Sequence, residues 1–142
     1  MVSVLIIEDD ASLSDLLYAM LTDEGYRATV LRTLDPAGIR VAVGQLEPDC
    51  VLLDGSGYAD YGDSWETAAW LHQRGRPVPT IMLTGFQAAA DEAQAGLSER
   101  SRAAGFAAVH SKPFDLDELL TAVERACGST VLGDSSEATV LP

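Results

Sequence analysis

Basic residues are scarce in this chain of 142 residues. It has nine Lys and Arg against 22 Asp and Glu, which gives a formal net charge of −13 at pH 7. Binding to nucleic-acid phosphates or to an anionic membrane surface requires clustered positive charge. We therefore expect the chain itself to bind no nucleic acid and no membrane.

Cysteine is also scarce, and the apolar runs are short. The two cysteines, Cys50 and Cys127, fall in apolar segments and are interpreted as small buried side chains. No apolar stretch approaches the roughly 20 residues of a membrane-spanning helix. The first apolar run follows Met1 almost directly, without the pattern of a signal peptide. These absences favour a cytoplasmic protein.

The chain does contain a regular alternation of short apolar runs and amphipathic segments. The runs predict strands near residues 2–8, 27–31, 50–53, 78–83 and 107–111. Helices are expected in between and after them, near residues 12–25, 36–46, 64–74, 87–104 with a break at Gly96, and from Asp115 onward. Five such alternations predict an α/β fold, with a five-stranded parallel sheet and five helices on its two faces. We expect one domain over residues 1–127 and a flexible tail over 128–142.

Some helix ends carry recognisable signals. Ser12 is predicted to cap the first helix and Gly25 to end it. Asp35 followed by Pro36 predicts a capped start of the second helix. An apolar stripe on the first helix is expected to face the core, formed by Leu13, Leu16, Leu17, Met20 and Leu21.

Charged residues follow three of the predicted strands. Glu8, Asp9 and Asp10 follow the first, Asp54 ends the third, and Lys112 follows the fifth. The carboxyl ends of parallel strands meet at one edge of a sheet, so these groups are expected to lie together. Neighbouring carboxylates repel one another, and a hard divalent cation such as Mg²⁺ relieves that repulsion.

An aspartate in such a site can act as a nucleophile toward phosphorus and form an acyl phosphate. The metal and the ammonium of Lys112 would offset the charge on the transferring group. Thr84, at the end of the fourth predicted strand, stands where its hydroxyl would contact the phosphoryl group.

Four short motifs occur in order along the chain: IIEDD, VLLD, MLTG and KPF. With these motifs, residues 2–127 resemble the receiver domain of the response regulators of bacterial two-component systems. The resemblance implies a flavodoxin-like, doubly wound sheet with strand order 2-1-3-4-5. It also implies a cis peptide before Pro113, which would direct Lys112 inward.

The resemblance also assigns roles to the site residues. Asp54 would be the phosphoacceptor and a ligand of Mg²⁺. Asp9 would bind the ion directly, Glu8 through water, and Ser56 through its main-chain carbonyl. Lys112 and Thr84 would contact the phosphoryl group, whereas Asp10 only matches a position that is commonly acidic.

Several positions depart from the family pattern. Tyr58 and Tyr61 stand where a proline and an acid are usual, and Val109 replaces the aromatic residue that rotates on activation. The segment between Thr84 and Lys112 is longer than usual, so the fourth helix is expected to be extended or split. The site chemistry is therefore expected to be intact, whereas the surface that reports phosphorylation is expected to be altered.

The leading functional hypothesis is a phosphorylation-controlled switch, not an enzyme that turns over a separate substrate. Its partners would be a histidine kinase or phosphotransfer protein and a downstream protein target. One alternative is a degenerate receiver that binds its partner without phosphorylation. Another is a phosphohydrolase with an aspartate nucleophile, which would place a second aspartate at the position of Ser56. A flavodoxin-type FMN protein is disfavoured, because the acids after the first strand would repel the cofactor phosphate.

Overall fold

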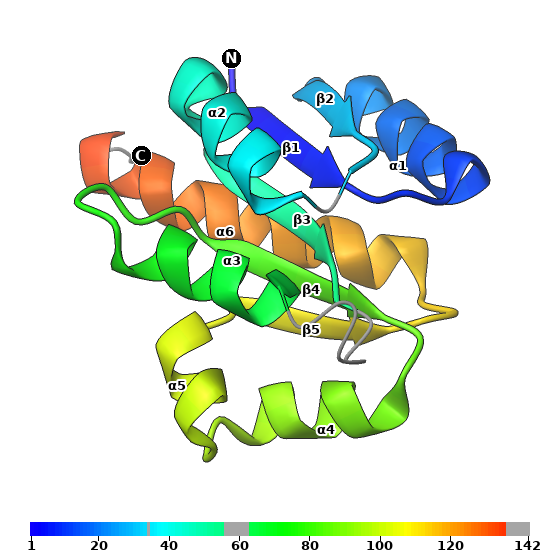
Figure 1. Cartoon of the computed structure of the whole chain (residues 1–142). Coiled ribbons are helices and arrows are strands. Elements are labelled where there is room, and N and C mark those ends of the chain that lie inside the picture. The colour runs from blue at the N-terminus through cyan, green and yellow to red at the C-terminus, as the bar shows by residue number, and fades with distance from the viewer. Residues whose placement is uncertain (34, 56–62, 136–142) are drawn as a thin grey trace.

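The structure is a computed structural model that describes residues 1–33, 35–55 and 63–135. Its five strands form a parallel sheet in the order β2-β1-β3-β4-β5 (Figure 1). The strands are β1 (Ser3–Ile7), β2 (Arg27–Leu31), β3 (Cys50–Asp54), β4 (Thr80–Thr84) and β5 (Ala108–Ser111). The predicted fold class and strand order are confirmed.

The described residues form six helices, one more than predicted. They are α1 (Ala11–Asp23), α2 (Pro36–Leu46), α3 (Asp63–Gln73), α4 (Gln87–Ala95), α5 (Glu99–Ala104) and α6 (Leu116–Ser135). The extra helix arises because the predicted fourth helix is split. Gly96 ends α4 in the left-handed conformation (φ 66°), and the Ser98 hydroxyl then accepts the Ser101 N–H to begin α5. The sequence signal at Gly96 was therefore a real helix end.

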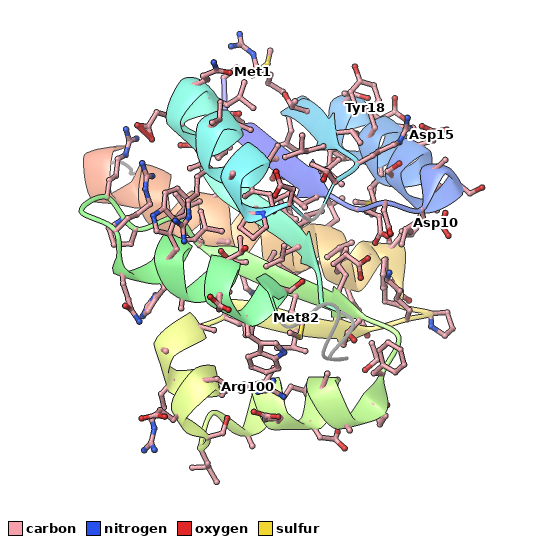
Figure 2. The ribbon with its side chains drawn as sticks, in the orientation of Figure 1. Met1, Asp10, Asp15, Tyr18, Met82 and Arg100 are labelled. Carbon is pink, nitrogen blue, oxygen red and sulfur yellow. The ribbon has the colours of Figure 1, made fainter. Side chains whose placement is uncertain are left out.

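Helices cover both faces of the sheet, which explains the nearly continuous apolar runs of the strands. On one face, Leu5, Ile7, Val51, Leu53 and Met82 pack against α2, α3, α4 and α5. On the other, the intervening strand residues pack against α1 and α6; they include Val4, Ile6, Leu52, Ile81 and Leu83. Figure 2 shows Met82 on the side of the sheet where Arg100 of α5 also lies. Cys50 and Cys127 are buried in the second core, as predicted.

Two predictions about α1 are wrong. The helix is capped by Asp10 rather than Ser12: the Asp10 carboxylate accepts the Leu13 N–H at 2.9 Å, and Ser12 lies inside the first turn. Of the predicted apolar stripe, Leu17 and Leu21 are fully buried, but Leu16 is 48% exposed. The stripe that packs on the sheet is therefore narrower than the apolar pattern indicated.

The last helix continues past the predicted end of the domain. α6 begins at Leu116 and runs to Ser135, so residues 128–135 of the predicted tail continue it. Leu119 and Val123 are fully buried against the sheet. Residues 136–142 lie outside the described part. Within the residues described, no helix combines the length and the apolar character needed to cross a membrane.

Candidate functional site

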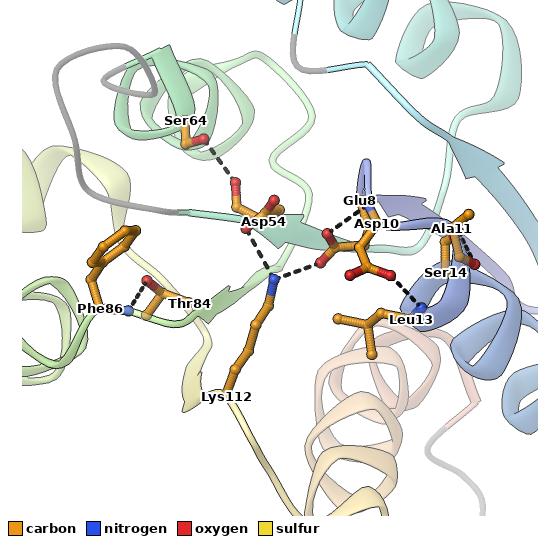
Figure 3. A network of polar contacts seen from close by, with 10 residues as sticks. All are labelled: Glu8, Asp10, Ala11, Leu13, Ser14, Asp54, Ser64, Thr84, Phe86 and Lys112. Atoms are coloured by element: carbon orange, nitrogen blue, oxygen red, sulfur yellow. Dashed lines mark hydrogen bonds and ion pairs between the residues drawn. The ribbon is translucent and has the colours of Figure 1, made fainter.

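Three acids and one lysine meet at the carboxyl edge of the sheet. Figure 3 shows Glu8, Asp54 and Lys112 of this cluster. One carboxylate oxygen from each of Glu8, Asp9 and Asp54 lies within 4.8 Å of the other two. Lys112 Nζ lies 2.9 Å from Glu8 Oε1 and 3.3 Å from Asp54 Oδ1. The acids come together because β1 and β3 are parallel neighbours. Ile7 of β1 pairs with Leu53 of β3, so the residues that follow these two lie at the same edge of the sheet.

Two of the acids in this cluster are buried, and burial disfavours their charged form. Glu8 is 0% exposed and Asp54 is 7% exposed. Burial and, after it, the charge of Glu8 raise the pKa of Asp54 to about 6, although Lys112 acts in the opposite direction. Burial would lower the pKa of Lys112, but the hydrogen bonds and charges of Glu8 and Asp54 raise it overall. The lysine is therefore held charged, and it does not fully offset the acids.

The three consecutive acids after β1 have different surroundings and roles. The second carboxylate oxygen of Glu8 accepts the Asp10 N–H at 3.2 Å, which holds Glu8 inside the site. Asp9 is exposed next to it. Asp10 turns away and caps α1 (Figure 3). The structure thus gives Asp10 a structural role that the motif left open.

Thr84 lies at the same edge, at the end of β4. Its side chain is fully buried, and its Oγ1 accepts the Phe86 N–H at 3.1 Å. Its main-chain carbonyl accepts the Lys112 N–H at 2.7 Å, so the threonine and the lysine are held side by side. Because Oγ1 acts as acceptor toward Phe86, the hydroxyl proton remains to be donated to another group.

Ser64 joins the site without any signal from the motifs. Its hydroxyl donates to the main-chain carbonyl of Asp54 at 2.8 Å, although the two residues are ten positions apart. In the sequence, Ser64 marks only the start of a predicted helix. The sequence did not predict this contact, because it depends on where the start of α3 packs relative to the end of β3.

The remaining predictions at the site have mixed outcomes. The Lys112–Pro113 peptide is cis, as the resemblance implied. Val109 is partly buried and packs against the core on the face of the sheet that α2, α3, α4 and α5 cover. Ser56, Tyr58 and Tyr61 lie outside the described residues, so the predicted main-chain ligand and the unusual loop stay predictions.

A doubly wound sheet with an acid pair after β1, an aspartate ending β3 and a lysine after β5 is the arrangement that the resemblance to receiver domains implied. A model of the response regulator receiver domain matches residues 4–124, and the chain therefore belongs to this family. The resemblance identified from the four motifs is confirmed.

Individual relatives agree with this assignment. The chain is 32% identical over 124 residues to the transcriptional regulatory protein PdtaR of Mycobacterium tuberculosis. The match covers 87% of this chain and 55% of PdtaR, so the chain spans about half the length of the curated relatives it matches.

Solved receiver domains share the fold. The signal receiver domain of a modulated diguanylate cyclase from Desulfovibrio desulfuricans G20 has a TM-score of 0.73 and 26% identity, covering 93% of this chain and 98% of that one. A response regulator receiver protein from Burkholderia phymatum has a TM-score of 0.69 and 26% identity, covering 90% and 96%. The receiver domain of TorR has a TM-score of 0.73 at 22% identity, covering 91% and 98%, and so shows the fold alone.

Proposed function

We propose that this chain is a phosphorylation-controlled switch in which Asp54 accepts a phosphoryl group in the presence of Mg²⁺. The observation that carries the proposal is the meeting of Glu8, Asp9, Asp54 and Lys112 at one sheet edge, with two of the acids buried. Buried acids held this close are costly unless the site binds a cation or uses the charge in a reaction.

The donor set suits a magnesium ion. The three acids offer carboxylate oxygens, which a hard divalent cation prefers, together with water. Asp9 and Asp54 would be direct ligands, Glu8 would act through water, and Ser56 would add its main-chain carbonyl. When bound, the ion would offset the negative charge of both the acids and an incoming phosphoryl group.

The chain's own residues account for the rest of the reaction. An oxygen of ionised Asp54 attacks phosphorus, the bond from phosphorus to the donor breaks, and the donor leaves with the electron pair. Since the pKa of Asp54 is raised only to about 6, most of it is ionised at pH 7. The Lys112 ammonium stabilises the transferred group, and the Thr84 hydroxyl donates a hydrogen bond to it.

The phosphoryl group would come from a histidine kinase or a phosphotransfer protein in the cytoplasm, and the output would be contact with a target protein. PdtaR is named as a transcriptional regulatory protein, and this chain matches about half of it. The replacement of the usual aromatic residue by Val109 favours one alternative, a receiver that binds its target without phosphorylation.

Labelling with acetyl phosphate tests the proposal. We expect one phosphoryl group per chain when acetyl phosphate and Mg²⁺ are both present, measured by intact mass spectrometry. Asp54→Asn should abolish labelling. Asp15→Asn should preserve it, because Asp15 lies on the exposed side of α1 in an ion pair with Arg32.

Each other result has a defined meaning. A chain that stays unlabelled contradicts the proposal and favours the phosphorylation-independent binding module. Labelling that persists in Asp54→Asn places the acceptor elsewhere. Steady turnover of a small phosphate ester by the purified chain would favour the phosphohydrolase.

A further inference from the structure

The main chain of Asp54 is held by a side chain of the next helix. Ser64, in the first turn of α3, donates its hydroxyl to the Asp54 carbonyl oxygen at 2.8 Å. Both residues are nearly inaccessible, with exposed fractions of 3% and 7%. Figure 3 shows Ser64 and Lys112 on opposite sides of Asp54.

This hydrogen bond completes the fixing of one peptide unit. The unit between Asp54 and Gly55 contains the Asp54 carbonyl and the Gly55 N–H, which point in opposite directions in a trans peptide. The Gly55 N–H donates to the Leu83 carbonyl of β4 at 2.8 Å. The Asp54 carbonyl accepts from Ser64 on the other side. Both polar groups of the Asp54–Gly55 peptide, the carbonyl and the N–H, are therefore held by hydrogen bonds.

Packing at Gly55 adds to this restraint. A Cβ built at Gly55 would lie 2.7 Å from Met82 Cε and 3.1 Å from Met82 Cγ, so the Met82 side chain packs closely against the main chain at Gly55. The Met82 contact limits movement of Gly55, and the Ser64 hydroxyl opposes rotation of the peptide unit. The direction of the Asp54 side chain is set by the Cα–N and Cα–C bonds, so holding this peptide unit also holds the direction in which the carboxylate leaves the main chain.

We propose that Ser64 is a positioning residue for the phosphoacceptor: by holding the Asp54–Gly55 peptide unit, its hydroxyl keeps the Asp54 carboxylate directed at Glu8, Asp9 and Lys112. The proposal rests on the proposed function, because it concerns the geometry of the group that is phosphorylated. Ser64 does not touch the reacting atoms, so it acts through Asp54.

A matched control exists on another helix. The Ser101 hydroxyl in α5 donates to the Ala93 carbonyl at 3.3 Å, and Ser101 is 4% exposed. It is thus a buried serine on a main-chain carbonyl, as Ser64 is, but it joins α5 to α4 rather than to the acceptor. If Ser64 contributed to stability alone, alanine at either serine would affect the labelling rate equally. If Ser64 positions Asp54, only the alanine at Ser64 should slow labelling.

The test compares Ser64→Ala, Ser64→Thr and Ser101→Ala with the wild-type chain. Labelling rates are measured over a range of acetyl phosphate and Mg²⁺ concentrations, and urea unfolding shows that each variant is folded. Misplacing a reacting group reduces the maximal rate, so we expect Ser64→Ala to label about 10-fold more slowly at saturation. The acetyl phosphate concentration for half-maximal rate should stay within about twofold, because Ser64 touches no donor atom.

Rescue and control separate positioning from stability. Ser64→Thr keeps the hydroxyl and should recover the rate to within about threefold of the wild type. If its added methyl prevents folding, Ser64→Cys takes its place and should give an intermediate rate, because a thiol is a weak donor. Ser101→Ala should lose stability comparably to Ser64→Ala yet label at the wild-type rate.

The proposed function and this inference fail in different ways. If the wild type labels and folded Ser64→Ala labels equally fast, the positioning role is overturned while the switch stands. Equal slowing in Ser64→Ala and Ser101→Ala also overturns it. Absence of labelling in the wild type overturns both.

Discussion

Asp54 is an acid whose ionised form the folded protein disfavours. Burial and the charge of Glu8 raise its pKa from 3.8 to about 6 despite Lys112. Because the folded pKa lies above the unfolded one, the folded state binds more protons between these two values. Stability therefore falls as the pH rises from about 4 to about 6, and the full cost of ionised Asp54 is present above that range.

Asp54→Asn should consequently stabilise the chain in buffer freed of divalent cations. The amide removes the charge and leaves Lys112 paired with Glu8. At pH 7.5 we expect a gain in the free energy of unfolding of up to about 3 kcal/mol, from 1.36 kcal/mol per pKa unit. The gain should vanish near pH 4, as measured by urea unfolding across this range. A gain that is the same at pH 4 and pH 7.5 would contradict the electrostatic origin.

At the scale of elements, two glycines end neighbouring helices in the same conformation but meet different surroundings. Gly96 ends α4 at φ 66° and Gly105 ends α5 at φ 54°. A Cβ at Gly96 would contact nothing within 4 Å, whereas one at Gly105 would lie 2.5 Å from His72 Nε2 of α3. Gly105 therefore permits close packing of α5 on α3, and Gly96 only permits the turn.

The two substitutions should differ in cost. Gly96→Ala meets only the left-handed backbone penalty and should lower the free energy of unfolding by about 1 kcal/mol. Gly105→Ala also displaces the His72 ring, which is exposed and can move partly aside, so it should cost about 2 kcal/mol. Urea unfolding measures both. In a double-mutant cycle, His72→Ala should recover most of the extra loss at Gly105, and equal costs at the two glycines would contradict this account.

At the scale of the whole molecule, a net charge of −13 opposes compaction everywhere, and the site concentrates part of that repulsion. Any salt screens the general repulsion. A cation bound by Glu8, Asp9 and Asp54 would stabilise the folded state further, because the unfolded chain does not assemble the site. The stabilisation from a bound cation can therefore be separated from the stabilisation that any salt gives by screening.

Mg²⁺ should raise the melting temperature more than NaCl does at equal ionic strength. At a concentration ten times the dissociation constant, linkage gives about 1.4 kcal/mol, or a rise of about 5 °C for a domain of this size. Thermal unfolding followed by circular dichroism measures the rise. In Asp9→Asn the difference between the two salts should shrink while the NaCl effect remains. Equal effects of both salts on the wild type would argue against a bound ion.

The strands could be predicted because helices cover both faces of the sheet. That environment requires a nearly continuous apolar run, and such runs marked β1, β2, β3 and β5 closely. β4 begins at Thr80 rather than at the predicted Val78, after Pro79, which lacks an N–H for the ladder. The exposure of Leu16 was misjudged because it depends on how α1 docks, which the local pattern does not define. The cap of α1 was misjudged because Asp10 and Ser12 are both good capping residues and lie two positions apart.

By itself, the sequence determined the fold class through its alternation of strands and helices. The charged residues that follow three strands also determined which side chains would meet at the sheet edge, because parallel strands bring their carboxyl ends together. Only the tertiary structure decided that Glu8 is fully buried and that Ser64 holds the main chain of Asp54. Burial and hydrogen bonding arise from packing between segments far apart in the chain, so no local pattern carries them. The raised pKa of Asp54 follows from that packing.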